Sequence, residues 1–251
     1  MIVTRVFCRA RCEAMLRFLG RESAFHSENN CGFFQLDGEL VLMDCPLSAF
    51  NKIRHIGADV LAGGKADGIT VLVTHTHTDH IGGIGMLIHY CCYVLGIPVR
   101  IVAPSREVAE DVRLLAHRLD GCSSDAYRII TPEEEDLGFN ALSVATTHTE
   151  ELADRCFGWV VDIGGRRFVY TGDTNTLGPF MPYLTKGCQL YTEASASDSP
   201  VHLFVDKLAD AVGELKKKDI QVFLMHLDNE EALAKAAECM GAVLAPLYGA
   251  G

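Results

Sequence analysis

The stretch Thr74-His75-Thr76-His77-Thr78-Asp79-His80-Ile81-Gly82-Gly83 places four metal-ligand side chains within six positions. It joins a predicted strand to a predicted helix. Side chains two apart in an extended chain point the same way, so His75 and His77 can share one metal ion. Asp79 and His80 fall on the turn, where they can face a second ion, and the two glycines let the backbone leave the site tightly. Three histidines this close are costly in a core without partners for their nitrogens, which favours a functional site.

Three further candidate ligands stand near the ends of predicted strands in the second half of the chain. They are His148 after a predicted strand over 142–147, Asp173 after one over 167–171, and His226 at the end of one over 222–226. Each residue alone is weak evidence for a metal site, because a single His or Asp at a strand end is often a hydrogen-bonded structural residue. Their order and placement after the first cluster fit a site for two metal ions.

Predicted strands and helices alternate in both halves of the chain. Asp37-Gly38 and Gly164-Gly165 favour the positive φ of tight hairpin turns, and Ser105 is a candidate helix cap. The predicted strands cover 31–37, 39–45, 69–74, 99–103, 142–147, 158–163, 167–171, 190–193 and 222–226, and the predicted helices cover 82–95, 107–119, 205–217 and 230–240. This pattern indicates two sheets packed together with helices outside.

Composition excludes several classes of protein. The 251 residues are 49% hydrophobic and 22% charged, enough for a large core, which excludes intrinsic disorder. A net charge of −11 opposes general nucleic-acid binding. Ten cysteines without a repeated C-x-x-C pair, and an N-terminus interrupted by arginines, predict reduced thiols and a cytoplasmic protein. The uncharged stretch 81–99 contains glycines and a proline, so a buried helix is expected there and not a membrane span.

The order His-x-His-x-Asp-His, a later His, Gly-Asp and a final His resembles the metallo-β-lactamase superfamily from roughly Leu16 to the C-terminus. The resemblance implies one α/β domain over 1–251, a four-layer αββα sandwich, with 1–15 as an extra N-terminal segment. It places His75, His77 and His148 on one metal ion, Asp79, His80 and His226 on the other, and Asp173 between them. Such ligands suit two Zn²⁺ ions first, with Mn²⁺ or Fe²⁺ as alternatives. The implied reaction is attack by a metal-bridging hydroxide, with Asp79 among the catalytic residues.

Within this superfamily the chain departs from three branches. True β-lactamases are secreted and do not use a bridging Asp, whereas Asp173 is present here. The flavodiiron branch replaces the second His of the first motif by Glu, but this chain keeps His77. Glyoxalase II adds a helical C-terminal domain, and only 25 residues follow His226. The phosphodiesterases remain.

Four segments resemble the ribonuclease Z-like branch of the phosphodiesterases. The opening of those proteins is similar to 16–24 with Asn29-Asn30 and to Val41-Leu42-Met43-Asp44-Cys45, and two of their loops are similar to Thr192-Glu193-Ala194-Ser195 and Val201-His202-Leu203. The resemblance implies that Glu193 orients His202 and that His202 protonates or hydrogen-bonds the leaving oxygen. The alternative is that His202 caps the helix that follows.

The expected substrate is a small or cyclic phosphodiester, because the acidic chain lacks the basic arm with which ribonuclease Z clamps tRNA. A lactonase or thioester hydrolase on the same metal site, a non-catalytic metal-binding protein and a tRNA 3′-end endonuclease are the alternatives. No membrane partner is expected. The segment Met1–Cys12 has two interpretations, an added edge strand or a contact in a homodimer.

Overall fold

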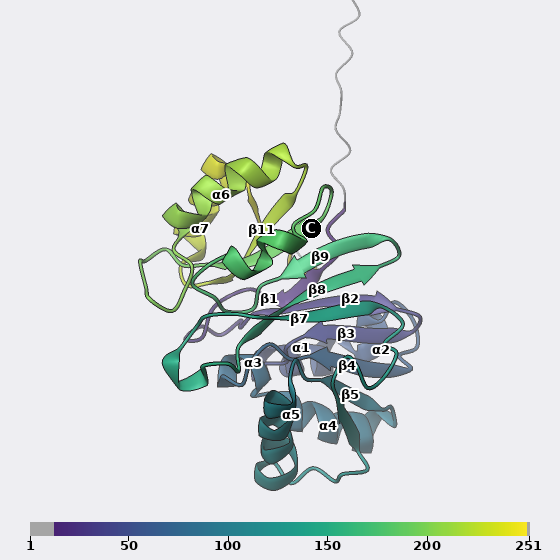
Figure 1. Cartoon of the computed structure of the whole chain (residues 1–251). Coiled ribbons are helices and arrows are strands. Elements are labelled where there is room, and N and C mark those ends of the chain that lie inside the picture. The colour runs from purple at the N-terminus through teal and green to yellow at the C-terminus, as the bar shows by residue number, and fades with distance from the viewer. Residues whose placement is uncertain (1–12, 250–251) are drawn as a thin grey trace, which may run out of the picture.

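Figure 1 shows the computed structural model of the chain, which describes residues 13–249. Two six-stranded sheets form its centre. The first contains β1 (Arg17–Gly20), β2 (Cys31–Leu36), β3 (Glu39–Met43), β4 (Gly68–Leu72), β5 (Val99–Val102) and β6 (Tyr127–Ile130), in that order. The second contains β7 (Asn140–Ala145), β8 (Phe157–Ile163), β9 (Arg166–Tyr170), β10 (Gln189–Ala194), β11 (Gln221–Leu227) and β12 (Val243–Leu244), with β7 at one edge and β12 at the other.

Both sheets have the same internal plan. Each opens with antiparallel strands, β1 to β3 in the first and β7 to β9 in the second, and continues with parallel strands to its far edge. The two predicted hairpin turns are confirmed, with φ of 49° and 86° at Asp37 and Gly38 and of 56° and 75° at Gly164 and Gly165. Parallel strands need crossover connections, and the helices supply them.

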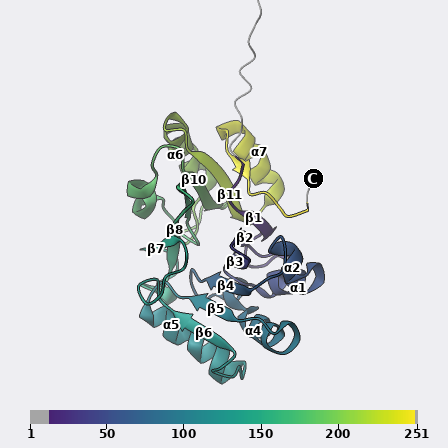
Figure 2. The same ribbon diagram turned by 90° about the vertical axis from the view of Figure 1, so that its right-hand side faces the viewer.

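The helices cover the outer face of each sheet (Figures 1 and 2). Over the first sheet lie α1 (Leu47–Ile56), α2 (Ala58–Leu61), α4 (Ile84–Tyr90) with the π-helical turn η1 (Cys91–Leu95), and α5 (Arg106–Arg113) with the π-helical turn η2 (Leu114–Leu119). Over the second lie the 3₁₀-helix η4 (Gly178–Tyr183), α6 (Val205–Lys217) and α7 (Glu230–Met240). Ser105 caps α5, because its hydroxyl accepts from Val108 N. The four-layer αββα sandwich is confirmed.

An aromatic core joins the two sheets. Its largest fully buried members are Phe18, Trp159, Phe168, Tyr170 and Tyr191. Each such side chain contributes roughly 1.5–3 kcal/mol of burial free energy. Trp159 also donates its indole N–H to the carbonyl of Val73 at 3.0 Å, which fixes the chain just before the histidine motif.

The prediction differs from the structure at several places. The strand predicted over 39–45 ends at Met43, because Asp44 turns into the left-handed region with φ of 62°. Helix α1 was not predicted, since it follows Pro46 without a side-chain cap, and β6 and β12 are too short to show an alternating pattern. The segment Met1–Cys12, with its two interpretations, lies outside the described residues. Within residues 13–249 no helix has both the length and the apolar character needed to cross a membrane.

Candidate metal centre

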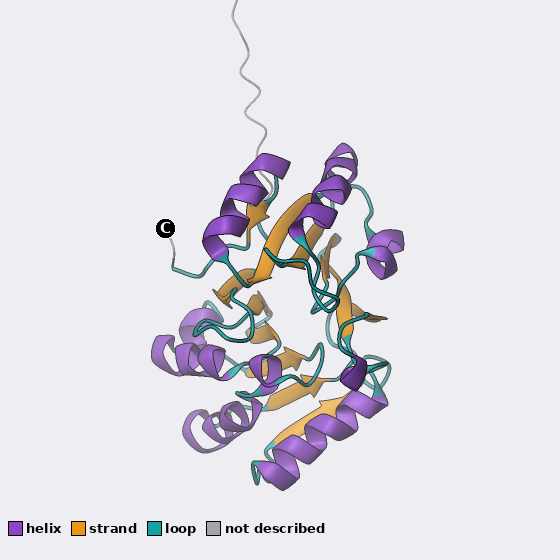
Figure 3. Ribbon diagram, turned by 90° about the vertical axis from the view of Figure 1, so that its left-hand side faces the viewer, coloured by secondary structure: helices purple, strands orange, loops and turns teal. Residues whose placement is uncertain are grey.

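The candidate ligands come from segments of both sheets and lie close together. Figure 3 shows loops from both sheets converging on the side that faces the viewer. The histidine motif follows β4 and includes the short helix α3 (Thr78–Ile81). Its backbone is tied to the second sheet, because Phe157 N donates to Thr74 O at 3.1 Å. After the motif, a Cβ on Gly83 would stand 2.5 Å from the carbonyl oxygen of Pro46, so glycine is required there for close approach.

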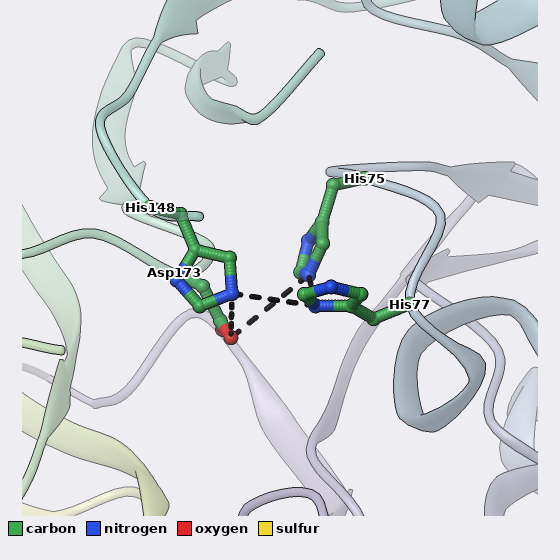
Figure 4. Close-up of side chains that lie close together, drawn as sticks. All are labelled: His75, His77, His148 and Asp173. Carbon is green, nitrogen blue, oxygen red and sulfur yellow. Dashed lines mark hydrogen bonds and ion pairs between the residues drawn. The ribbon is translucent and has the colours of Figure 1, made fainter. Parts of the chain in front are cut away.

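One group of ligand atoms comes from His75, His77, His148 and Asp173, whose side chains point toward one another in Figure 4. His77 Nδ1 is 3.0 Å from His75 Nε2 and 3.3 Å from His148 Nε2. The Asp173 Oδ2 atom is 3.5 Å from His148 Nε2 and 3.9 Å from His75 Nε2. Ligands 2.0–2.1 Å from a tetrahedral metal ion lie about 3.3 Å from one another, so these separations match a metal site.

A second group consists of Asp79, His80 and His226. Asp79 Oδ2 is 3.4 Å from His80 Nε2 and 3.3 Å from His226 Nε2. Asp173 faces this group as well, with Oδ1 at 3.3 Å from His80 Nε2 and Oδ2 at 3.5 Å from His226 Nε2. The carboxylate of Asp173 therefore lies between the two groups.

Asp44 determines which ring nitrogen of two histidines faces the centre. Its Oδ2 atom is 2.9 Å from His80 Nδ1 and 2.8 Å from the hydroxyl of Thr74, and Oδ1 accepts from Thr74 N at 2.7 Å. Since an ionised carboxylate only accepts, His80 Nδ1 and the hydroxyl both donate. The hydroxyl oxygen then accepts from His75 Nδ1 at 3.1 Å. Both Nε2 atoms are left with lone pairs directed at the centre, as metal ligation requires.

Backbone contacts orient two other ligands. His148 Nδ1 donates to the carbonyl of Val201 at 2.9 Å, which leaves its Nε2 lone pair for the centre. His226 adopts the left-handed backbone, with φ of 51°, which few non-glycine residues do. The buried side chain of Asn30 supports that conformation by accepting from His226 N at 3.3 Å and donating to the hydroxyl of Tyr170 at 2.6 Å.

The charges of the centre fit divalent cations. Burial lowers the pKa of His75, and burial also lowers the pKa values of His77 and His148, so these imidazoles favour the neutral form that binds metal. Burial alone would lower the pKa of His80, but the negative charge of Asp173 raises it. His80 Nε2 and Asp173 Oδ1 are buried and have no hydrogen-bond partner within the described chain. Carboxylates that attract a proton to His80 also attract a metal cation.

A carboxylate–histidine pair stands beside the centre. His202 Nδ1 is 2.7 Å from Oε2 of Glu193, which is 1% exposed, while the other oxygen of Glu193 accepts from Thr174 N. Burial alone would lower the pKa of His202, but its bond to Glu193 raises the pKa to about 9. The ring of His202 lies 5.0 Å from that of His148 between centroids. Helix α6 has Phe204 at its N-cap position, without a side-chain cap bond, so His202 does not cap it.

The structure brings together all nine candidate residues named from the sequence, seven in the two ligand groups and two in the adjacent pair. Sequence reasoning did not assign the roles of Thr74, Asp44 and Asn30 in orienting ligands. The available signal was a polar residue at the end of a buried strand, which Asp44 provides after β3. Its pairing with a histidine 36 positions later is not visible in sequence spacing.

Solved structures share the fold. YhfI from Bacillus subtilis, a metallo-β-lactamase fold protein, superposes with a TM-score of 0.70 at 20% identity and covers 94% of this chain and 96% of its own. A diphosphatase of the PhnP family gives a TM-score of 0.64 at 19% identity, covering 88% and 90%. The short form of human tRNase Z gives 0.62 at 20% identity, covering 86% and 93%.

The sequence comparisons identify a narrower group of proteins than the shared fold does. The Anti-Pycsar protein Apyc1 of Bacillus phage vB_BveM-Goe7 is 27% identical over 249 residues, covering 86% of this chain and 90% of the phage protein. An Anti-Pycsar protein Apyc1 of Paenibacillus xerothermodurans is 29% identical over 92 residues, covering 36% of this chain and 35% of that protein. The family model for Anti-Pycsar protein Apyc1 matches residues 14–244. The chain is therefore a metal-dependent hydrolase that belongs to the Anti-Pycsar Apyc1 family.

Proposed function

We propose that the protein hydrolyses the phosphodiester of a cyclic nucleotide with two divalent metal ions. The observation that carries the proposal is the convergence of seven ligand side chains in two groups that share Asp173. The family supports the substrate class, because Anti-Pycsar Apyc1 proteins degrade cyclic nucleotides. A cyclic mononucleotide is also the small phosphodiester expected for an acidic chain without a basic arm.

The ligands divide between two ions. One ion would be held by His75, His77 and His148, and the other by Asp79, His80 and His226, with Asp173 shared. Histidine and carboxylate ligands favour Zn²⁺, with Mn²⁺ and Fe²⁺ as the alternatives. Metal ions bound there supply positive charge for phosphate oxygens and lower the pKa of water.

His202 would protonate the leaving oxygen. Its Nδ1 faces Glu193, so its Nε2 is the atom available to substrate, and the imidazole remains partly exposed. A raised pKa keeps the ring protonated at neutral pH, as an acid for an alkoxide requires. Glu193 acts through His202 by holding the ring and its charge. Breaking a cyclic phosphodiester releases a ribose alkoxide, which is a poor leaving group that needs this proton.

A second candidate is hydrolysis of a lactone or thioester at the same metal site. The observation that favours it is the pairing of basic side chains on the segments that border the centre. Arg21 bonds Glu230 at 2.6 Å, and Lys52 pairs with Glu28. These cations are committed to carboxylates and are not positioned as free phosphate ligands. His202 supplies the positive charge in their place, so the phosphodiester is the first candidate.

The experiment is a substrate comparison on protein loaded with Zn²⁺ or Mn²⁺. We expect a 3′,5′-cyclic mononucleotide and bis-p-nitrophenyl phosphate to be hydrolysed faster than a generic lactone or thioester. Metal analysis should give about two ions per chain, and His77→Ala should lower both metal content and hydrolysis. Full activity of a metal-free preparation would refute the metal site, and faster turnover of the lactone or thioester would establish the second candidate.

A further inference from the structure

His202 lies on a loop over 196–204, which is called the His202 loop below. The base of the loop is closed by two backbone hydrogen bonds of 2.9 Å, from Ser195 N to Leu203 O and from Val205 N to Ser195 O. Ser195 therefore holds the two ends of the loop together. Because His202 immediately precedes Leu203, any movement of the loop base moves its imidazole.

Asp228 bonds the base of this loop with both carboxylate oxygens. Oδ2 accepts from the hydroxyl of Ser195 at 2.7 Å, and Oδ1 accepts from Ala196 N at 2.8 Å. Asp228 stands two residues after His226, just beyond the end of β11. Hydrogen bonds to an ionised carboxylate are roughly twice as strong as neutral ones. The bonds thus join the base of the His202 loop to the strand that carries a candidate metal ligand.

The far side of the loop rests on the other candidate ligands. Asn175, two residues after Asp173, donates its Nδ2 to the carbonyl of Pro200 at 2.8 Å, and His148 donates to the carbonyl of Val201. With Asp228 at the base, the His202 loop is bonded to chain segments that carry three of the seven ligands. The position of His202 relative to the metal centre is therefore fixed through the backbone of the loop, as well as through Glu193.

We propose that Asp228 is a positioning residue, which fixes the His202 loop to β11 and so holds His202 at the leaving oxygen of the substrate. The inference rests on the proposed phosphodiesterase function. The bond to Glu193 fixes one nitrogen of the imidazole but leaves the backbone of His202 to be fixed by the loop. Asp228 supplies that second constraint, since it bonds the loop base directly.

The chain offers variants that separate this role from a general loss of charge. Asp228→Ala removes both bonds. Asp228→Asn keeps an oxygen to accept from Ala196 N, and the Ser195 hydroxyl, already 2.8 Å from Ser197 O, can donate there while it accepts from the new amide. Asp198→Asn is the matched control. It removes a carboxylate that lies on the His202 loop itself, but the ion pair of Asp198 with Lys207 is exposed at both ends and contributes little.

The first measurement is hydrogen exchange of the metal-loaded protein without substrate. Asp228→Ala should speed exchange in the His202 loop by about tenfold, because Ala196 N loses its acceptor. Asp228→Asn and Asp198→Asn should leave the protection close to that of the unchanged protein. Unaltered exchange in Asp228→Ala would overturn the proposal even if the substrate proved to be something other than a phosphodiester.

The second measurement compares two leaving groups. Asp228→Ala should lower kcat for a 3′,5′-cyclic mononucleotide by about 10–100-fold, as loss of a supporting hydrogen bond does, with KM within about threefold. The kcat for bis-p-nitrophenyl phosphate, whose phenolate leaving group needs no proton, should fall much less. Asp228→Asn should recover most of the rate. Equal losses on both substrates, or loss of metal from Asp228→Ala, would overturn the role and show that Asp228 acts through His226. Failure of the unchanged protein to cleave either phosphodiester would instead refute the proposed function.

Discussion

Two carboxylate–histidine pairs stand at the centre, and they differ in burial. Asp44 bonds His80 Nδ1 at 2.9 Å, and Glu193 bonds His202 Nδ1 at 2.7 Å. The first histidine has a fully buried side chain, whereas the side chain of the second is 28% exposed. The same pair of groups is therefore suited to two different purposes. A buried imidazole whose free nitrogen faces other ligands is suited to hold a metal ion, and an open one is suited to deliver a proton to substrate.

The two carboxylates also differ in the other hydrogen bonds that they accept. Asp44 also accepts from the backbone and the hydroxyl of Thr74, so it orients two ligands at once. Glu193 also accepts from Thr174 N, beside Asp173. His202 still lies within ligand distance of Asp173 and His226. Metal content is therefore the measurement that distinguishes a metal ligand from a proton donor.

The largest effect is expected from His202→Ala. If His202 is the proton donor, kcat for a 3′,5′-cyclic mononucleotide falls by about 10²–10⁴-fold, while bis-p-nitrophenyl phosphate loses far less. The variant should retain about two metal ions, because all seven candidate ligands are intact. Steady-state kinetics on both substrates with metal analysis checks this. Loss of one metal ion would show that His202 is a ligand and would remove the contrast with His80. Equal decreases in kcat on both substrates would show that His202 has a structural role.

Asp44→Asn should give the next largest effect. Asparagine tolerates the positive φ of this position, but its amide presents N–H groups where Asp44 only accepts. Misoriented ligands should lower metal affinity by about 10–100-fold. Titration with a competing chelator measures the metal affinity. Chemical denaturation of the metal-free protein shows whether the substitution also changes the free energy of unfolding. Unchanged affinity would show that His75 and His80 keep their orientation without the carboxylate.

Glu193→Gln should cost about tenfold in kcat on cyclic nucleotides, with metal content unchanged. The amide can still accept from Thr174 N, but it cannot stabilise a charged His202. In a His202→Ala background the same substitution should have little further effect, since Glu193 acts through the imidazole. Additive losses in the double variant would mean that Glu193 has a role independent of His202.

Salt should give the smallest effect. Salt ions screen the attraction within the partly exposed Glu193–His202 pair but not within the buried Asp44–His80 pair. The rate of hydrolysis of a cyclic mononucleotide should therefore change by less than about twofold between 50 and 200 mM salt. An enzyme that contacts 6–10 phosphates loses roughly 10³–10⁵ in affinity over the same range. A steep fall, together with efficient cleavage of precursor tRNA, would favour the tRNA 3′-end endonuclease.

Local pattern was enough to predict most strands and to name the seven candidate ligands that the structure brings together. His75 to His80 form one continuous motif, and alternating strands with glycine turns indicate both sheets. The orientation of the ligands was not predictable, because it depends on contacts between distant positions. Asp44 meets His80 across 36 residues and Asn30 meets His226 across 196. Asp228 reaches Ser195 across 33 residues through a turn that has no sequence signature.

The division of the chain between the sheets has a consequence for how the protein matures. The first sheet uses residues 17–130 and the second uses residues 140–244. His77 and His148 are 71 positions apart, and Asp79 and His226 are 147 apart. Contacts between such distant positions form late, because the intervening chain must first be ordered. During synthesis the motif at His75 emerges long before its partners, so the complete centre exists only after β11 has been made and has docked on the older half. The candidate ligand set is therefore complete only at a late stage of folding.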